Sequence, residues 1–196
     1  MKIAIAQIDM DFENKEYAME LCNQLMAEAK EKQADFIVFP EMTLTGFTLN
    51  PETYGEDRKN SKTISFFKEK AKKNELAVCF GLPVFENGIA TNHCFILDEN
   101  GEALADYAKI HPFSFGEEAK HYIGGSELQY CEIKGVPVSP LICYDLRFPV
   151  WSRNAGNHYD LLVNIANWPT VRIGAAEILA KARAVENVAY MVFCNR

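Results

Sequence analysis

The sequence predicts an α/β fold, built as a two-layer sandwich rather than as a purely doubly wound parallel sheet. Three observations support this prediction: the first part of the chain alternates strand and helix patterns, the middle is a run of strand patterns, and the last part returns to strand, helix and strand. Such an order favours helices layered on mixed sheets. The 196 residues are enough for one substantial domain, expected over residues 1–196, and rather few for two.

The first part contains three strand patterns and two helix patterns. Residues 2–8 alternate and are rich in β-branched side chains, which predicts a strand. Residues 14–32 repeat apolar side chains at helical spacing. The run DFIVFP at 35–40 is short, apolar and closed by proline, as in a strand buried on both faces. A second helix is expected over 61–73, followed by the strand LAVCFGL at 76–82.

The remaining part begins with paired strands. Residues 92–110 are expected to form two strands joined by a turn at ENG, and residues 130–143 a hairpin that turns at KG. The run DLLVNIANW at 160–168 predicts another buried strand. The last helix is expected over 173–188, and the chain ends at FCNR directly after a final strand pattern.

Composition narrows the possible partners and compartments. The net charge of −7 argues against a nucleic-acid partner, because phosphate binding needs clustered Lys and Arg. No apolar run approaches the roughly 20 residues of a membrane-spanning helix. The N-terminus, MKIAIAQIDMDF, has too short an apolar stretch for a signal peptide. We therefore expect a cytoplasmic protein that binds neither nucleic acid nor membrane.

Neither the cysteines nor the histidines show a metal-binding or disulfide pattern. The six cysteines include no Cys-x-x-Cys pair, and most lie inside apolar runs. Such cysteines are typical of free, buried thiols. The four histidines have no zinc-ligand spacing with one another or with the cysteines. No metal site is predicted.

Three polar residues stand at the carboxyl ends of otherwise apolar strands. They are Glu41 after DFIVFP, Lys109 after ALADYA and Cys143 after VPVSPLI. Ligands of α/β sheets gather beyond the carboxyl ends of strands, so a site is expected where these three residues meet. A nearby cation and a base favour the thiolate form of cysteine, and backbone N–H groups after Cys143 can complete an oxyanion hole.

Each of the three also has a plain structural interpretation when taken alone. Glu41 can belong to an ordinary turn, Lys109 can be a solvated strand end, and Cys143 can be one more core thiol. Only their combination indicates chemistry.

The segments around these residues resemble the nitrilase superfamily of carbon–nitrogen hydrolases, and in particular its omega-amidase branch. The resemblance lies in FPEMTLTGF around the glutamate, YAKIHPFSFGEE around the lysine and LICYDLRFPVWSRN around the cysteine. ANWPT, KARAVENVAY and the final CNR are similar to the family as well, so the resemblance runs from residue 2 to the last residue. It implies the α-β-β-α sandwich of the nitrilase type.

The resemblance also implies catalytic roles. Cys143 would be the acylated nucleophile, Glu41 the general base and Lys109 the oxyanion stabiliser, with the backbone N–H of Tyr144 as a second oxyanion donor. Family members place a further glutamate after the lysine. Glu117 and Glu118 are both candidates, and the distance to the following glycine pair favours Glu118.

For the substrate, the resemblance implies a small amide and no cofactor. Omega-amidases cleave the terminal amide of 2-oxo dicarboxylic acid monoamides and release ammonia. Arg147 can bind the carboxylate of such a substrate bidentately, or it can form a structural ion pair. Asn167 and Trp168 would line the same pocket with Phe113 opposite, although Trp168 can also serve packing alone.

Relatives continue beyond the final Asn-Arg with further strands. We therefore expect a single carbon–nitrogen hydrolase domain that is truncated at its C-terminus and lacks the family's last strands. Two alternatives stay open: an N-carbamoyl-type amidohydrolase of the same family, and a non-catalytic interaction subunit.

A homodimer or higher homo-oligomer is also expected. The helix predicted over 173–188 is dense in small residues, which allow close approach of another element. The resemblance implies that this layer pairs across a two-fold axis, so that one substitution is felt twice. On this basis Ala176→Arg should shift the dimer towards monomer or aggregate.

Overall fold

The computed structural model describes residues 1–196 and contains two sheets. In the first sheet the strands follow the order β1-β2-β3-β4-β5; β1, β2 and β3 are parallel, and β4 and β5 are antiparallel to their neighbours. Its strands are β1 (Ile3–Ile5), β2 (Phe36–Val38), β3 (Ala77–Glu86), β4 (Ile89–Leu97) and β5 (Ala103–Ala108).

The second sheet has the order β6-β7-β8-β9, in which β6 and β7 form an antiparallel hairpin and β7, β8 and β9 are parallel. Its strands are β6 (Cys131–Ile133), β7 (Val136–Ile142), β8 (Leu161–Ala166) and β9 (Tyr190–Asn195). The three parallel strands therefore direct their carboxyl ends to one edge of this sheet.

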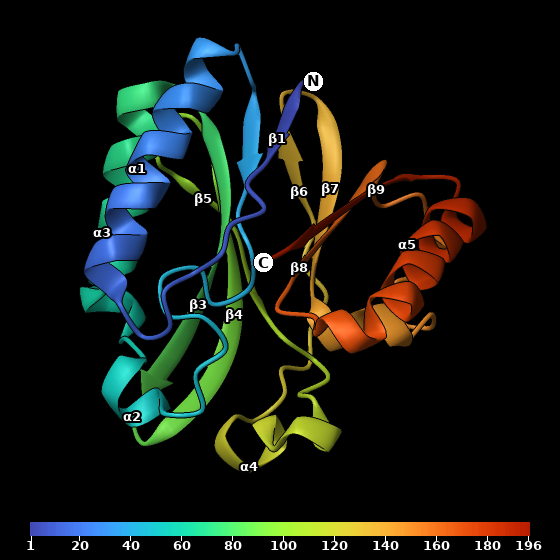
Figure 1. Ribbon diagram of the computed structural model, residues 1–196. Helices are drawn as coiled ribbons and strands as arrows, with labels where there is room; N and C mark the ends of the chain where they lie inside the picture. Colours follow the sequence, from blue (N-terminus) through green and yellow to red (C-terminus); the bar gives the residue numbers. More distant parts are fainter.

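Helices cover the outer faces of both sheets (Figure 1). Helices α1 (Lys15–Glu31) and α3 (Lys62–Asn74) lie on the first sheet, and α5 (Ile173–Asn187) lies on the second. The structure thus has two α/β layers packed sheet against sheet, which confirms the predicted α-β-β-α sandwich. No helix combines the length and the apolar character needed to cross a membrane.

Short helical turns occupy the connections. They are α2 (Pro51–Tyr54), η1 (Arg58–Asn60), η2 (Ser114–Gly116), α4 (Glu118–His121), η3 (Cys143–Arg147) and η4 (Thr170–Arg172). Two of them, α4 and η3, begin at Glu118 and Cys143, so these turns orient residues that the sequence already singled out.

The hydrophobic core has two main parts. A cluster of 24 buried residues includes Phe36 and Val38 of the first sheet and Val163 and Cys194 of the second, so it lies between the sheets. A second cluster of 20 buried residues joins the first sheet to its helices. All six cysteines are free thiols, and five of them are buried, as predicted.

The third strand is longer than the sequence predicted. It continues past residue 82 to Glu86 and turns at Asn87 and Gly88 into β4. Pro83 interrupts the apolar run, but it lies beyond the end of β2, where the ladder on that side has already stopped at Cys79. The missing N–H of the proline therefore breaks no bond to β2.

The position of Ala176 in helix α5 shows that the effect expected of Ala176→Arg on the dimer is wrong. Ala176 is fully buried, so Ala176→Arg would disrupt packing within one chain and cannot report on a dimer. The exposed face of α5 carries Ile178 and Val185 instead, with 70% and 79% of their surfaces exposed.

Candidate active site

The three predicted catalytic residues converge between the carboxyl ends of strands from both sheets. Glu41 follows β2, Lys109 follows β5, and Cys143 opens η3 directly after β7. Their exposed fractions are 0% for Glu41, 1% for Lys109 and 8% for Cys143. Lys109 is therefore not a solvated strand end, and Glu41 does not belong to an ordinary surface turn.

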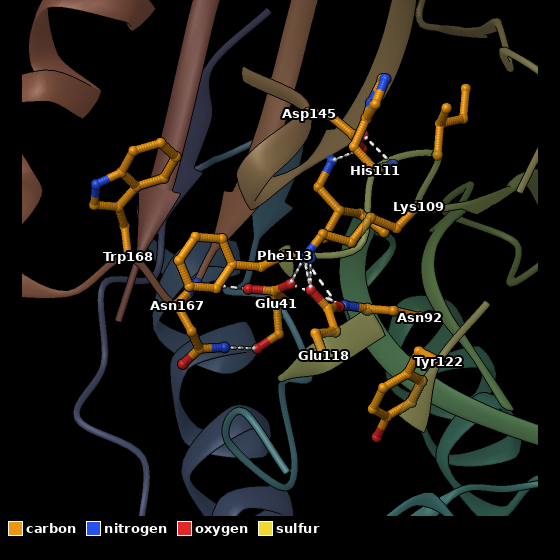
Figure 2. Close-up of polar contacts among 12 residues, drawn as sticks. Glu41, Asn92, Lys109, His111, Phe113, Glu118, Tyr122, Asp145, Asn167 and Trp168 are labelled. Carbon is orange, nitrogen blue, oxygen red and sulfur yellow. Dashed lines mark hydrogen bonds and ion pairs between the residues drawn. The ribbon is translucent and has the colours of Figure 1, made fainter. Parts of the chain in front are cut away.

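Lys109 lies between two buried carboxylates (Figure 2). Its Nζ donates to Oε1 of Glu41 at 2.8 Å and to Oε1 and Oε2 of Glu118 at 3.0 and 2.8 Å. Burial alone would lower the pKa of Lys109, but the charges of Glu41 and then of Glu118 outweigh it and hold the pKa above its ordinary value. The lysine is thus a permanent cation in the site.

Of the two adjacent glutamates, only Glu118 belongs to this cluster. Glu118 is fully buried, and its Oε2 also accepts from the backbone N–H of Phe113 at 2.6 Å. Glu117 is exposed and pairs with Lys120 at 2.6 Å. The structure therefore places Glu118, not Glu117, beside the lysine.

Glu41 is held in place by hydrogen bonds from the loop after β8 and by the backbone of β3, which runs close to the turn that carries it. The N–H of Asn167 donates to Oε2 of Glu41 at 2.8 Å, and its Nδ2 donates to the Glu41 carbonyl at 2.5 Å. A Cβ on Gly81 of β3 would lie 2.2 Å from the backbone nitrogen of Met42. Only glycine allows β3 to run so close to the turn that carries the glutamate.

Cys143 stands at a sharp bend. Its φ of 45° lies in the left-handed region, which is costly for a residue other than glycine and is often found at functional sites. Burial and, secondly, the charge of Glu41 raise the pKa of the thiol well above its usual range, while Lys109 acts in the opposite direction. The resting thiol is therefore protonated and needs a base before it can act as a nucleophile.

Asp145 anchors this bend to the strand that ends at the lysine. Its carboxylate accepts from the Tyr107 hydroxyl at 2.8 Å, from the N–H of His111 at 2.9 Å and from the N–H of Ile142 at 3.1 Å. Nδ1 of His111 is also 2.8 Å from Oδ1 of Asp145. The fully buried Asp145 thus maintains the geometry of the loop that carries Cys143.

A cavity of about 510 Å³ opens above the thiol. It is lined by Phe47, Phe113, Phe115, Gly116, Cys143, Tyr144, Arg147, Asn167, Trp168, Pro169 and Arg172. All the residues predicted to contact a substrate are therefore on its wall. The oxyanion role of the Tyr144 backbone N–H stays a prediction.

Arg147 is free to receive an anion. It forms no ion pair, and its guanidinium lies 5.3 Å from the ring centre of Trp168. The alternative of a structural ion pair is therefore wrong. Trp168 is 5% exposed and its backbone N–H donates to Asn195 at 2.6 Å, so it combines packing with a place on the cavity wall.

Several residues of the site escaped the sequence analysis. Asn92, Phe47 and Arg172 carry the clearest contributions: Asn92 contacts both buried carboxylates, Phe47 lies 5.7 Å from Nζ of Lys109, and Arg172 lies 5.0 Å from the ring centre of Phe113. The signals available in the sequence were a polar residue, Asn92, at the start of the strand pattern predicted over 92–110, and an arginine, Arg172, soon after ANWPT. In the structure Asn92 lies inside β4 rather than at its start.

Comparison with known proteins agrees with this geometry. The family model "Carbon-nitrogen hydrolase" matches residues 2–196. The chain is 36% identical to Omega-amidase YafV of Yersinia enterocolitica over 171 residues, covering 84% of this chain and 63% of that protein. It is 35% identical to 2-oxoglutaramate amidase of Bacillus subtilis over 174 residues, covering 88% of this chain and 67% of that protein.

Solved structures show the same fold. A CN-hydrolase superfamily protein from Xanthomonas campestris superposes with a TM-score of 0.93 at 28% identity, covering 99% of this chain and 75% of that one. An amidase from Nesterenkonia sp. superposes with a TM-score of 0.92 at 24% identity, covering 100% and 75%. The chain spans 63% of the Yersinia relative's length. With the family match extending over residues 2–196, the chain belongs to the carbon–nitrogen hydrolase family.

Proposed function

We propose that the protein hydrolyses the C–N bond of a small carboxylate-bearing amide, such as the monoamide of a 2-oxo dicarboxylic acid, and releases ammonia through a cysteine thioester. One observation carries the proposal: the Cys143 thiol, the Glu41 carboxylate and the buried Lys109 ammonium meet at the base of a cavity lined by Arg147, which has no carboxylate partner. The names of the relatives, an omega-amidase and a 2-oxoglutaramate amidase, support this substrate class.

In the proposed reaction Glu41 takes the proton of the Cys143 thiol while the sulfur attacks the amide carbon. Lys109 and the backbone N–H of Tyr144 stabilise the negative charge on the carbonyl oxygen. The proton passes from Glu41 to the leaving nitrogen, and ammonia departs. Glu41 then deprotonates a water that cleaves the thioester and regenerates the thiol, so that the net change is amide plus water to acid plus ammonia.

Glu118 supports this chemistry by pairing with Lys109 and restricting where the ammonium can lie. Arg147 would bind the substrate carboxylate, with its guanidinium 5.3 Å from the ring centre of Trp168 and with Phe113 and Asn167 completing the wall. Because the guanidinium presents two parallel donors, it favours a carboxylate over a neutral group.

An ammonia-release assay tests the proposal. A 2-oxo dicarboxylate monoamide should be hydrolysed, whereas an N-carbamoyl amino acid of similar size should be hydrolysed slowly or not at all. The reverse preference would favour the N-carbamoyl amidohydrolase. No release from either compound, under conditions where Cys143 can be alkylated, would contradict amide hydrolysis and favour the non-catalytic interaction subunit.

We also propose a homodimer that pairs through the outer face of α5. Ile178 and Val185 lie seven residues apart on this helix and are both largely exposed, as are Val188 at 93% and Tyr190 at 81% beside it. Exposed apolar side chains grouped in this way are typical of an association surface. The cytoplasmic location stays a prediction.

A further inference from the structure

Asn92 contacts the site from a strand that carries none of the predicted catalytic residues. It lies on β4 opposite Pro83 of β3 and is buried, with 1% of its surface exposed. Its Nδ2 donates to Oε1 of Glu41 at 2.8 Å and to Oε1 of Glu118 at 2.9 Å (Figure 2). One amide group thus bridges the two buried carboxylates.

The charge balance shows why a bridging donor is needed. Two carboxylates share a single ammonium, that of Lys109, so the three side chains carry one uncompensated negative charge. The remaining stabilisation comes from neutral donors: the N–H of Asn167 to Glu41, the N–H of Phe113 to Glu118, and Nδ2 of Asn92 to both. Asn92 supplies the one side-chain donor among them.

The orientation of the Asn92 amide follows from the same contacts. Its Oδ1 is buried and accepts no hydrogen bond, whereas Nδ2 uses both of its hydrogens. A reversed amide would place its oxygen against two carboxylate oxygens, which would repel it. The backbone carbonyl of Asn92 also accepts from the N–H of Lys109 at 2.8 Å, so the same residue locates the cation.

We propose that Asn92 is a positioning residue that holds the carboxylates of Glu41 and Glu118 in place on either side of Lys109 and stabilises their negative charge through its two N–H donors. The inference rests on the proposed role of Glu41 as the base for Cys143. The titratable groups around Glu41 are Lys109 after β5, Glu118 of α4, Cys143 of η3 and Tyr122 after α4. None of them but Lys109 stabilises a negative charge on Glu41, so the remaining stabilisation of that charge comes from the neutral donors Asn92 and Asn167.

The test compares the pH dependence of two reactions in the full chain. Asn92→Asp preserves the shape of the side chain and removes the donors, and Asn92→Leu removes the donors without adding charge. Asn164→Leu is the matched control, because Asn164 of β8 is equally buried and its amide bonds to no protein group. The two reactions are ammonia release from 2-oxoglutaramate and alkylation of Cys143 by iodoacetamide, followed on the Cys143 peptide by mass spectrometry.

In both Asn92 variants the acidic midpoint of the two pH profiles should move to higher pH by about one unit, the size of effect expected for losing a hydrogen bond to a charged group. The shift should be larger for Asp, and the Asn164→Leu midpoint should match the parent. Because acid also destabilises the fold, the folded fraction of each variant is measured by circular dichroism over the same pH range and each profile is divided by it. A merely structural role then predicts no shift in the corrected midpoint.

The outcomes separate the two proposals. If the parent releases no ammonia but its alkylation midpoint moves in the Asn92 variants, the substrate class is wrong and the role of Asn92 stands. Midpoints that coincide with the parent would overturn the inference. Failure of both Asn92 variants to fold while Asn164→Leu folds would overturn it too, in favour of a structural role. A parent whose Cys143 does not react at all would overturn both proposals.

Discussion

Nζ of Lys109 lies 2.8 Å from Oε1 of Glu41, although 68 residues separate them in the chain. Both side chains are inaccessible to water, with 1% and 0% of their surfaces exposed. An ion pair at this depth is costly to break, because removing one partner leaves an unpaired buried charge. This pairing therefore links the stability of the fold to the proposed chemistry.

Cys143→Ala should abolish amide hydrolysis while the protein stays folded. Alanine removes the nucleophile, and the small change in volume at a residue that is 8% exposed leaves the packing nearly intact. Ammonia release and the thermal unfolding temperature are the two measurements. Substantial hydrolysis by a folded Cys143→Ala protein would show that another group is acylated.

Lys109→Met should lower the hydrolysis rate by about 10²-fold or more, as expected for losing an oxyanion donor. The same change leaves Glu41 and Glu118 as unpaired buried carboxylates, which costs about 3–5 kcal/mol of stability. Lys109→Arg should not restore the rate, because the guanidinium is larger and flatter than the ammonium. A steady-state assay on protein shown to be folded checks both variants; near-normal turnover in Lys109→Met would exclude the catalytic role.

Gly81→Ala should damage the site through the backbone. The added Cβ would lie 2.2 Å from the nitrogen of Met42 and 2.8 Å from the carbonyl carbon of Glu41. Backbone atoms cannot move aside as a flexible side chain can, so we expect a loss of about 1–3 kcal/mol in the free energy of unfolding together with reduced hydrolysis. Gly174→Ala is the control, because a Cβ added there would meet no atom within 4 Å and the backbone is helical.

Acid should destabilise the protein through Glu56. Burial opposes ionisation of this carboxyl, but hydrogen bonds from Lys15, Ser61 and Thr63 outweigh it and lower its pKa from 4.5 to about 2. A carboxyl whose pKa is lower in the folded state stabilises the fold fully above pH 4.5, and this stabilisation is lost as the pH falls towards 2. The contribution is about 3 kcal/mol.

Denaturant unfolding at several pH values measures this effect. Glu56→Gln should be less stable than the parent at pH 7, and the difference should shrink as the pH falls from 4.5 towards 2. The exposed Glu52→Gln serves as the control. A constant difference between Glu56→Gln and the parent over this range would contradict the assignment.

Ile178→Glu combined with Val185→Glu should convert the proposed dimer into a folded monomer. Both side chains are largely exposed in the single chain, so the added charges disrupt an interface and leave the core untouched. Light scattering at micromolar concentration gives the mass. A parent that is already monomeric would contradict the proposed dimer.

The three long helices and the buried strands were predictable from the sequence because their signals are local. Helix α1 extends over Lys15–Glu31 against a prediction of 14–32, and α5 over Ile173–Asn187 against 173–188. Periodic apolar side chains report which face of an element is buried, and strand-to-loop transitions marked Glu41, Lys109 and Cys143 as candidates.

Only the tertiary structure decided between Glu117 and Glu118. It also showed that Arg147 forms no structural ion pair and that Asn92 lies between two carboxylates. These are distances between side chains on different elements, and they depend on how far each strand extends and how the two sheets stack. Periodicity within one element carries no information about its register against another, so a donor such as Asn92 becomes recognisable only when the strands are assembled.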